Sequence, residues 1–188
     1  MKVFVPLCLC ASVPFPFGPL ALCTFGPIFT AINCRHLYTH QQASLVRKEF
    51  WTILGQYLAP IPSSEGIKIN WINYRTGVKH FHVKMDATDS RAFISLELDH
   101  KDPEMQRLYF EQLIAMEGIF MEIMQESWDW QLLHINEHDK PVSLIIKEFV
   151  GLKVLNKDNW PLIISFFKER ILKLDQFWSI AKDQFLYT

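Results

Sequence analysis

The chain has 188 residues, of which 49% are hydrophobic, and a formal net charge of −1. This length predicts one domain with a core large enough to fold without disulfide or metal support. Removing the two positive charges of Lys2 and Arg35 from −1 leaves −3 for residues 37–188, which excludes a strongly basic domain of the kind that binds phosphates non-specifically.

The first 36 residues differ from the rest. Between Val3 and Cys34 they carry no charge and contain all four cysteines and five of the ten prolines. The prolines interrupt each apolar run that could span a bilayer, so no transmembrane span is expected. Two interpretations remain: upstream sequence added by a start site placed too early, or a degenerate signal sequence. We expect residues 1–36 to lie outside the fold and residues 37–188 to form a single domain.

Residues 37–188 contain no cysteine. A disulfide framework, a thiolate metal site and a cysteine nucleophile are therefore excluded from the expected domain. This composition fits a reducing setting, and we predict a cytoplasmic location.

A capping box predicts where the first helix begins. Thr39 and Gln42 have the spacing at which a threonine hydroxyl accepts from the third backbone N–H and the glutamine reaches back to the cap. Apolar residues then recur at helical spacing from Val46 to Leu58, and two prolines follow. Residues 59–79 have no such period. Because about twenty structureless residues are unusual in a compact domain, we expect a further strand near residues 68–74 or a functional loop.

Residues 79–86 and 91–99 alternate between apolar and polar side chains, which predicts a hairpin. A tight turn through Thr88 and Asp89 keeps both apolar sets on one face. The pairs predicted by this register are His80 with Glu97, His82 with Ser95, and Asp86 with Arg91.

Three further elements complete the pattern. Asp102 caps one central helix over residues 103–124, a second hairpin pairs residues 128–135 with 142–150, and Asp158 or Asn159 caps a long C-terminal helix. The predicted fold class is α+β, with an antiparallel sheet of two hairpins packed against helices in the order α-ββ-α-ββ-α.

Three stretches carry a resemblance to a known family. They are RKEFWTILGQYLAPIPSSEGIKINWINYRTGVKHFHVKMDA, ELDHKDPEMQRLYFEQL and LNKDNWPLIISFFKERI. Over about Leu37 to Tyr187 the chain resembles a bacterial domain-of-unknown-function family, DUF4268, whose members are mainly small stand-alone proteins that open where this chain has Leu37. The resemblance implies a cytoplasmic protein with no established activity. Longer relatives carry a similar module behind nuclease-like regions, which implies a role around nucleic acid.

Asp86, Glu97, Asp99 and Lys101 are the strongest catalytic candidates. A carboxylate on one strand and an acidic-x-Lys triplet on the next is an arrangement with which metal-dependent nucleases hold a divalent cation and a water. Antiparallel pairing places Asp86 beside the turn and Glu97 near the other end, so structural roles are favoured. A nuclease using Asp86, Glu97 and Lys101 is the alternative prediction, and we expect no catalytic residue and no cofactor.

His80 and His82 could bind zinc or iron if Glu97 joined them. A two-residue spacing on a strand is common by chance, so a solvated polar face is favoured over this metal site. Phosphate-binding glycine loops, nucleophile elbows and His-Glu-x-x-His motifs are absent from the sequence.

The predicted binding surface is Trp71, Asn73, Tyr74, Arg75 and Lys79. This mixture suits stacking on a base or gripping a peptide. The competing interpretation is that Trp71 and Tyr74 cover a sheet edge. We therefore predict a non-catalytic binding or regulatory module with a protein or nucleic-acid partner, and the sequence does not indicate an oligomeric state.

Overall fold

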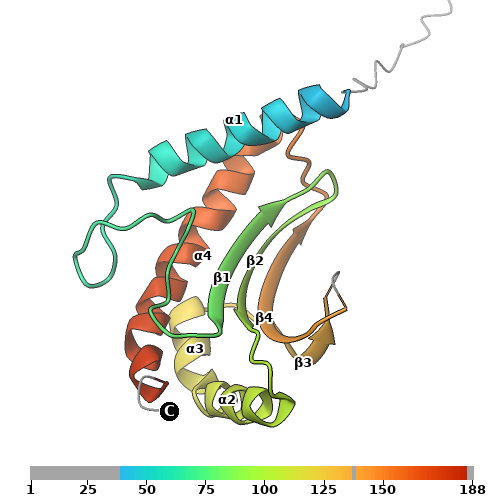
Figure 1. The fold of residues 1–188 in the computed structure, drawn as a ribbon. Coiled ribbons are helices and arrows are strands. Elements are labelled where there is room, and N and C mark those ends of the chain that lie inside the picture. Colours follow the sequence, from blue (N-terminus) through green and yellow to red (C-terminus); the bar gives the residue numbers. More distant parts are fainter. Residues whose placement is uncertain (1–38, 137–138, 186–188) are drawn as a thin grey trace, which may run out of the picture. The chain divides into compact units, whose positions relative to one another are not determined.

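The computed structural model describes residues 39–136 and 139–185, and the predictions for residues 1–36 lie outside these ranges. The α+β class and the element order are confirmed, except that the middle helix is divided. The elements are α1 His40–Leu58, β1 Phe81–Ala87, β2 Arg91–Leu98, α2 Pro103–Ala115, α3 Glu117–Met124, β3 Asp129–Ile135, β4 Pro141–Val150 and α4 Trp160–Ala181, with short 3-10 turns at Lys157–Asn159 and Lys182–Gln184 (Figure 1). Within the described ranges, no helix has both the length and the apolar character needed to cross a bilayer.

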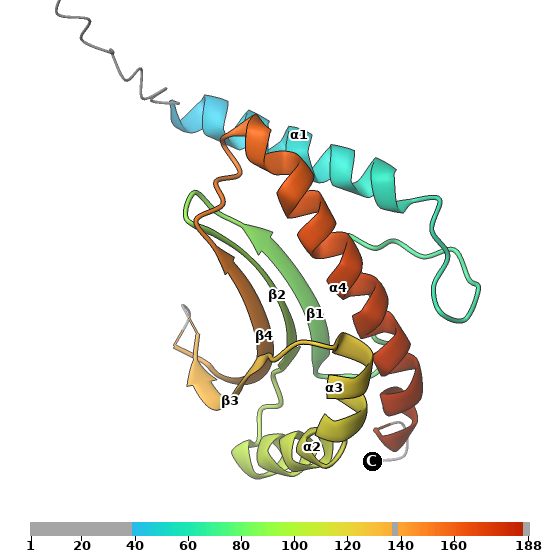
Figure 2. The ribbon, with the colours of Figure 1, turned by 180° about the vertical axis from the view of Figure 1, so that it is seen from behind.

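The four strands form one antiparallel sheet in the order β1-β2-β4-β3. Figures 1 and 2 show α3 and α4 against one face of this sheet and α1 alongside the first turns of α4. The face turned to the helices carries the apolar half of each alternating strand, and on β2 these side chains are all buried: Ala92, Ile94, Leu96 and Leu98. Against them α4 packs a buried stripe that includes Ile163, Phe167, Ile171, Leu174 and Trp178.

The predicted capping box is confirmed at the start of α1. The backbone N–H of Gln42 donates to the Thr39 hydroxyl at 3.3 Å, and the Thr39 N–H donates to the Gln42 side-chain oxygen at 3.0 Å. This helix therefore has a complete N-terminal cap of its own.

The predicted register of the first hairpin is wrong by two residues. Asp86 lies opposite Phe93, and Glu97 lies opposite His82. The turn is displaced by one residue and runs through Asp89 and Ser90. The backbone N–H of Thr88 donates to the Arg91 carbonyl at 2.8 Å, and the Thr88 hydroxyl accepts from the backbone N–H groups of Ser90 and Arg91. Arg91 is thereby released from Asp86, and its guanidinium pairs with Glu148 of β4 at 2.6 Å.

The single central helix predicted over residues 103–124 is two helices. The backbone leaves the helical region at Met116, with φ −98° and ψ 8°. This break redirects the chain, so that Phe110 of α2 and Phe120 of α3 both contact the ring of Trp130, at 6.0 and 5.4 Å between centroids. Aromatic packing against β3 therefore outweighs the helical continuity that the sequence period indicates.

Candidate functional site

Residues 59–80 form a long loop beside α4, and the strand predicted near residues 68–74 is absent from this fully described segment. Two indole groups hold the loop in place. The Nε1–H of Trp71 donates to the Ile61 carbonyl at 2.8 Å, and the Nε1–H of Trp178 on α4 donates to the Thr76 carbonyl at 2.8 Å. Because the Trp71 side chain is only 2% exposed, it belongs to the core. Its predicted role as a stacking surface for a ligand is therefore corrected.

Asp175 is a buried carboxylate that holds this loop at two points. Its Oδ2 accepts from the backbone N–H of Ser64 at 2.6 Å, and its Oδ1 accepts from the Tyr74 hydroxyl at 2.7 Å. Asp175 is 5% exposed, so the two hydrogen bonds replace water around its charge. We call these three residues the Asp175 clamp.

The clamp also changes the chemistry of Tyr74. Burial, together with the hydrogen bond to Asp175 and its negative charge, raises the pKa of the Tyr74 phenol well above its usual range. The ring stacks on Trp71 with 6.1 Å between centroids and 19° between planes. Tyr74 is therefore a neutral hydrogen-bond donor that fastens the loop to α4.

The sequence interpretation did not include Asp175. It sits among buried residues of α4, between Leu174 and Trp178, where the helical period requires a residue facing the core. A charged residue at such a position must have hydrogen-bonding partners. A charged residue at a core-facing position of the predicted helix is therefore the sequence signal that could have indicated Asp175 as a site residue.

The clamped loop and α4 enclose a cavity of about 640 Å³. Of the predicted binding residues, Asn73, Tyr74 and Arg75 line it, whereas Trp71 and Lys79 do not. Its full lining is Ser63, Glu65, Ile67, Ile69, Asn70, Asn73, Tyr74, Arg75, Asp175, Trp178, Ser179 and Lys182. We call this space the loop cavity.

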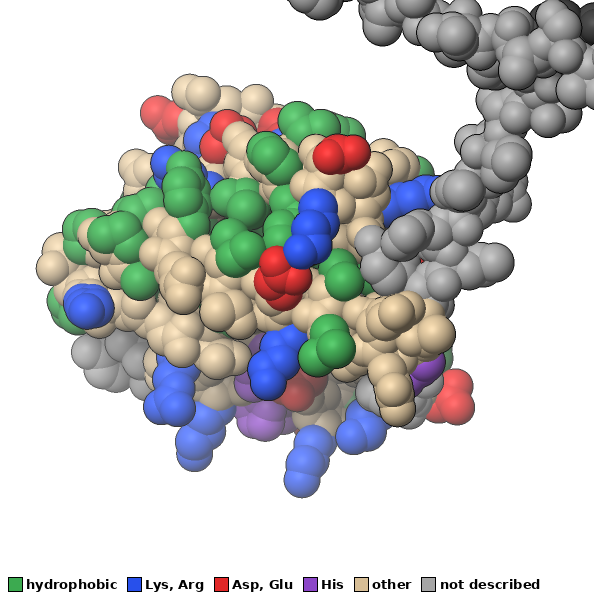
Figure 3. Space-filling view, turned by 90° about the horizontal axis from the view of Figure 1, so that it is seen from above, with side chains coloured by type: hydrophobic (Ala, Val, Ile, Leu, Met, Phe, Trp, Pro, Cys, Tyr) green, Lys and Arg blue, Asp and Glu red, His purple; other side chains and the backbone are tan. Residues whose placement is uncertain are grey.

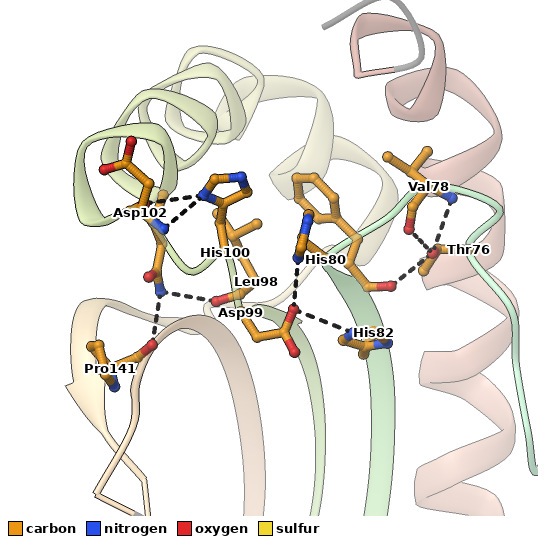
Figure 4. Close-up of polar contacts among 11 residues, drawn as sticks. Thr76, Val78, His80, His82, Leu98, Asp99, His100, Asp102 and Pro141 are labelled. Atoms are coloured by element: carbon orange, nitrogen blue, oxygen red, sulfur yellow. Dashed lines mark hydrogen bonds and ion pairs between the residues drawn. The ribbon is translucent and has the colours of Figure 1, made fainter.

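A second polar group lies where the loop enters β1. His80 Nδ1 and His82 Nε2 each lie 3.4 Å from Oδ1 of Asp99, and Figure 4 shows both rings turned toward this carboxylate. His80 precedes β1 and has a left-handed backbone with φ 68°, which takes it out of the predicted strand alternation. The ring of His100 packs edge-on against His80 at 4.5 Å between centroids.

The predicted grouping of His80, His82 and Glu97 does not form. Glu97 instead pairs with Lys84 at 2.5 Å and accepts from the Ser95 hydroxyl at 3.1 Å. Among the residues that the structure describes, no group of three or more His, Cys, Asp or Glu side chains is placed to hold a metal ion.

The three residues of the nuclease alternative are also kept apart. Asp86 lies opposite Phe93, four residues before Glu97 on β2, and at about 3.4 Å per residue this separates the two positions by about 14 Å along the hairpin. The Asp86 carboxylate accepts from the adjacent Ala87 N–H at 2.8 Å. Lys101 is exposed between β2 and α2. One divalent cation could not contact both carboxylates in this arrangement.

Four exposed cations lie on the loop or next to the histidines in sequence. Lys68, Arg75 and Lys79 on the loop are exposed, and so is Lys101 beside the histidines. None of the four forms an ion pair with a described residue, whereas the only carboxylate of the loop, Glu65, is paired with Lys182. Figure 3 shows several Lys and Arg side chains projecting on the side of the molecule where a group of histidines lies.

Fold and site together define a small α+β domain in which a long loop, clamped to a helix by a buried aspartate, lines a polar cavity and carries exposed cations that form no ion pair with a described residue. Residues 46–182 match the profile of the family described as "Domain of unknown function (DUF4268)". The chain belongs to this family, which confirms the resemblance found in the sequence. No curated protein and no solved structure matches the chain.

Proposed function

We propose that the domain is a non-catalytic binding module whose partner is nucleic acid, contacted through its phosphates. The observation that carries this proposal is the set of exposed cations on one clamped loop, Lys68, Arg75 and Lys79, none of which forms an ion pair with a described residue. The Glu65–Lys182 ion pair neutralises the only acidic side chain of that loop. The loop is therefore locally positive although residues 37–188 carry a formal charge of −3.

Several cations on one loop that is held to α4 suit a repeating anionic partner. Each phosphate contact releases a condensed counterion, so binding of this kind depends strongly on salt. Because the ring of Trp71 is buried, base stacking on it is not available, and the contacts left to this surface are mainly electrostatic. An acidic protein would be attracted by the same charges. The resemblance to modules that follow nuclease-like regions supports nucleic acid.

The test is fluorescence anisotropy with a labelled single-stranded oligonucleotide of about twelve nucleotides. The double variant Arg75→Ala/Lys79→Ala should weaken binding about tenfold and reduce the slope of log affinity against log salt by about 1 to 1.5, as expected for two lost phosphate contacts. Lys48→Ala/Lys153→Ala is the matched control, because both lysines are exposed and form no ion pair with a described residue. It removes the same charge and should leave affinity nearly unchanged.

Two results would contradict the proposal. The first is absence of oligonucleotide binding by the full chain at low salt. The second is an equal loss of affinity in the control pair, which would show a response to net charge without a defined surface. Binding of a polyglutamate peptide with higher affinity than the oligonucleotide would indicate an acidic protein partner instead.

The alternative, a divalent-metal-dependent nuclease using Asp86, Glu97 and Lys101, gains no support from the geometry, because the two carboxylates are paired locally and lie far apart.

A further inference from the structure

Most polar groups that line the loop cavity already have partners. The Tyr74 hydroxyl donates to Asp175, and the Trp178 indole donates to Thr76. The Ser63 hydroxyl accepts from the Ile67 N–H, and the Ser179 hydroxyl donates to the Gln176 carbonyl. The Tyr74, Trp178 and Ser179 donors are therefore engaged in stabilising the loop and α4, whereas the O–H of Ser63 has no acceptor among the described residues.

Three amide and guanidinium side chains in the cavity also have free hydrogen-bonding groups. The Asn70 side-chain oxygen accepts from the N–H groups of Ile72 and Asn73, which leaves its amino group free. The Asn73 carboxamide and the Arg75 guanidinium make no hydrogen bond or ion pair with a described residue. The cavity therefore offers the positive charge of Arg75 and two amide groups, and its two carboxylates, Glu65 and Asp175, are both engaged.

The shape and chemistry of these groups match a nucleotide. A guanidinium binds phosphate oxygens with two parallel N–H donors, and a carboxamide presents the adjacent donor and acceptor that complement the edge of a base. The side chains of Ile67 and Ile69 and the ring of Tyr74 provide apolar surface for the faces of a base. A volume of 640 Å³ lies within the ordinary range of small-molecule sites.

We propose that the loop cavity is a subsite for one nucleotide of a single strand, with its phosphate on Arg75 and its base edge on Asn73. This inference rests on the proposed function, because the same loop cations would hold the strand that enters the cavity. It goes beyond the proposed function, because Asn73 can contact the edge of a base only where that base is not paired with a second strand. The domain would then prefer single-stranded over double-stranded nucleic acid.

The experiment compares two labelled single strands of equal length, one with bases and one with an abasic sugar-phosphate backbone. The full chain should bind the base-containing strand about three- to tenfold more tightly, the effect of one or two net hydrogen bonds. Asn73→Ala should remove this preference and keep the affinity for the abasic strand. Arg75→Ala should weaken binding to both strands.

Asn159→Ala is the matched control, because Asn159 precedes α4 outside the cavity and caps no helix with its side chain. It should keep the preference for bases. Equal affinity of the full chain for both strands, or an unchanged preference in Asn73→Ala, would overturn the inference and leave the proposed function standing. Absence of binding to either strand would overturn the proposed function, and this inference with it.

Discussion

The Tyr74 hydroxyl donates a 2.7 Å hydrogen bond to Oδ1 of Asp175, a residue 101 positions further along the chain. The same carboxylate accepts from the backbone N–H of Ser64. One side chain of α4 therefore fixes both ends of the segment that lines the loop cavity. The loop cavity therefore depends on the contact between Asp175 and the loop. A variant that removes this contact should have a lower free energy of unfolding.

Asp175→Ala should lower the free energy of unfolding by about 2 to 4 kcal/mol, because the partly buried Tyr74 hydroxyl and the Ser64 backbone N–H lose a charged acceptor. Tyr74→Phe should cost less, about 1 to 2 kcal/mol, since the carboxylate keeps the Ser64 N–H. Urea denaturation measures both. Asp183→Ala, at an exposed position, should change stability by no more than about 0.5 kcal/mol. Equal effects of Asp175→Ala and Asp183→Ala would contradict the clamp.

The raised pKa of Tyr74 predicts a loss of stability in alkaline solution. The unfolded phenol ionises near pH 10, while the folded phenol stays protonated to higher pH. Its contribution is therefore complete below about pH 10 and decreases as pH rises above that value. Urea denaturation between about pH 9 and pH 11.5 should show a steeper decline for the full chain than for Tyr74→Phe.

Tyr57→Phe removes an exposed phenol and is the matched control for this measurement. If Tyr74→Phe follows the alkaline profile of the unchanged chain, the fold does not favour the protonated form of Tyr74.

Trp71 should behave as a core residue. Trp71→Ala should destabilise the domain by about 3 to 5 kcal/mol, because it removes a large buried ring and leaves the Ile61 carbonyl without its donor. Trp71→Phe should recover much of this loss. Thermal and urea unfolding measure both variants. A Trp71→Ala variant within about 1 kcal/mol of the full chain would show that the ring is dispensable for the fold.

The capping box at Thr39 predicts that a chain beginning with methionine at position 37 folds without the preceding residues. Its Tm should lie within about 2 °C of the full-length value, less than the shift expected for 1 kcal/mol at this size. We also expect higher solubility, because an apolar segment of this length favours association. A fall in Tm of about 10 °C would show that residues 1–36 contribute to the fold.

We predict that the purified protein does not cleave DNA or RNA with magnesium or manganese. The reason is the separation of Asp86 from Glu97 along the hairpin and the pairing of Glu97 with Lys84. Metal-dependent cleavage that disappears in Glu97→Gln but persists in Glu49→Gln would overturn this prediction and favour the nuclease alternative.

Local chemistry in the sequence was sufficient to predict the element types and most boundaries. The capping box at Thr39, the N-cap at Asp102 and the alternation from Phe81 to Leu98 were all predicted, because each depends on residues close together in the chain. The same local character let the sequence indicate that Asn73 and Arg75 belong to a distinctive loop. It could not show which residues of that loop face solvent.

Tertiary structure decided the features that depend on distant partners. Arg91 of the first hairpin pairs with Glu148 of β4, and Trp130 packs against both Phe110 and Phe120 across a broken helix. Trp71 is buried, and Asp175 accepts hydrogen bonds from Ser64 and Tyr74, because α4 packs beside a loop about a hundred residues earlier in the chain. Hydrophobic burial and hydrogen bonding act between groups that are close in space, so no short sequence window contains both partners of the clamp.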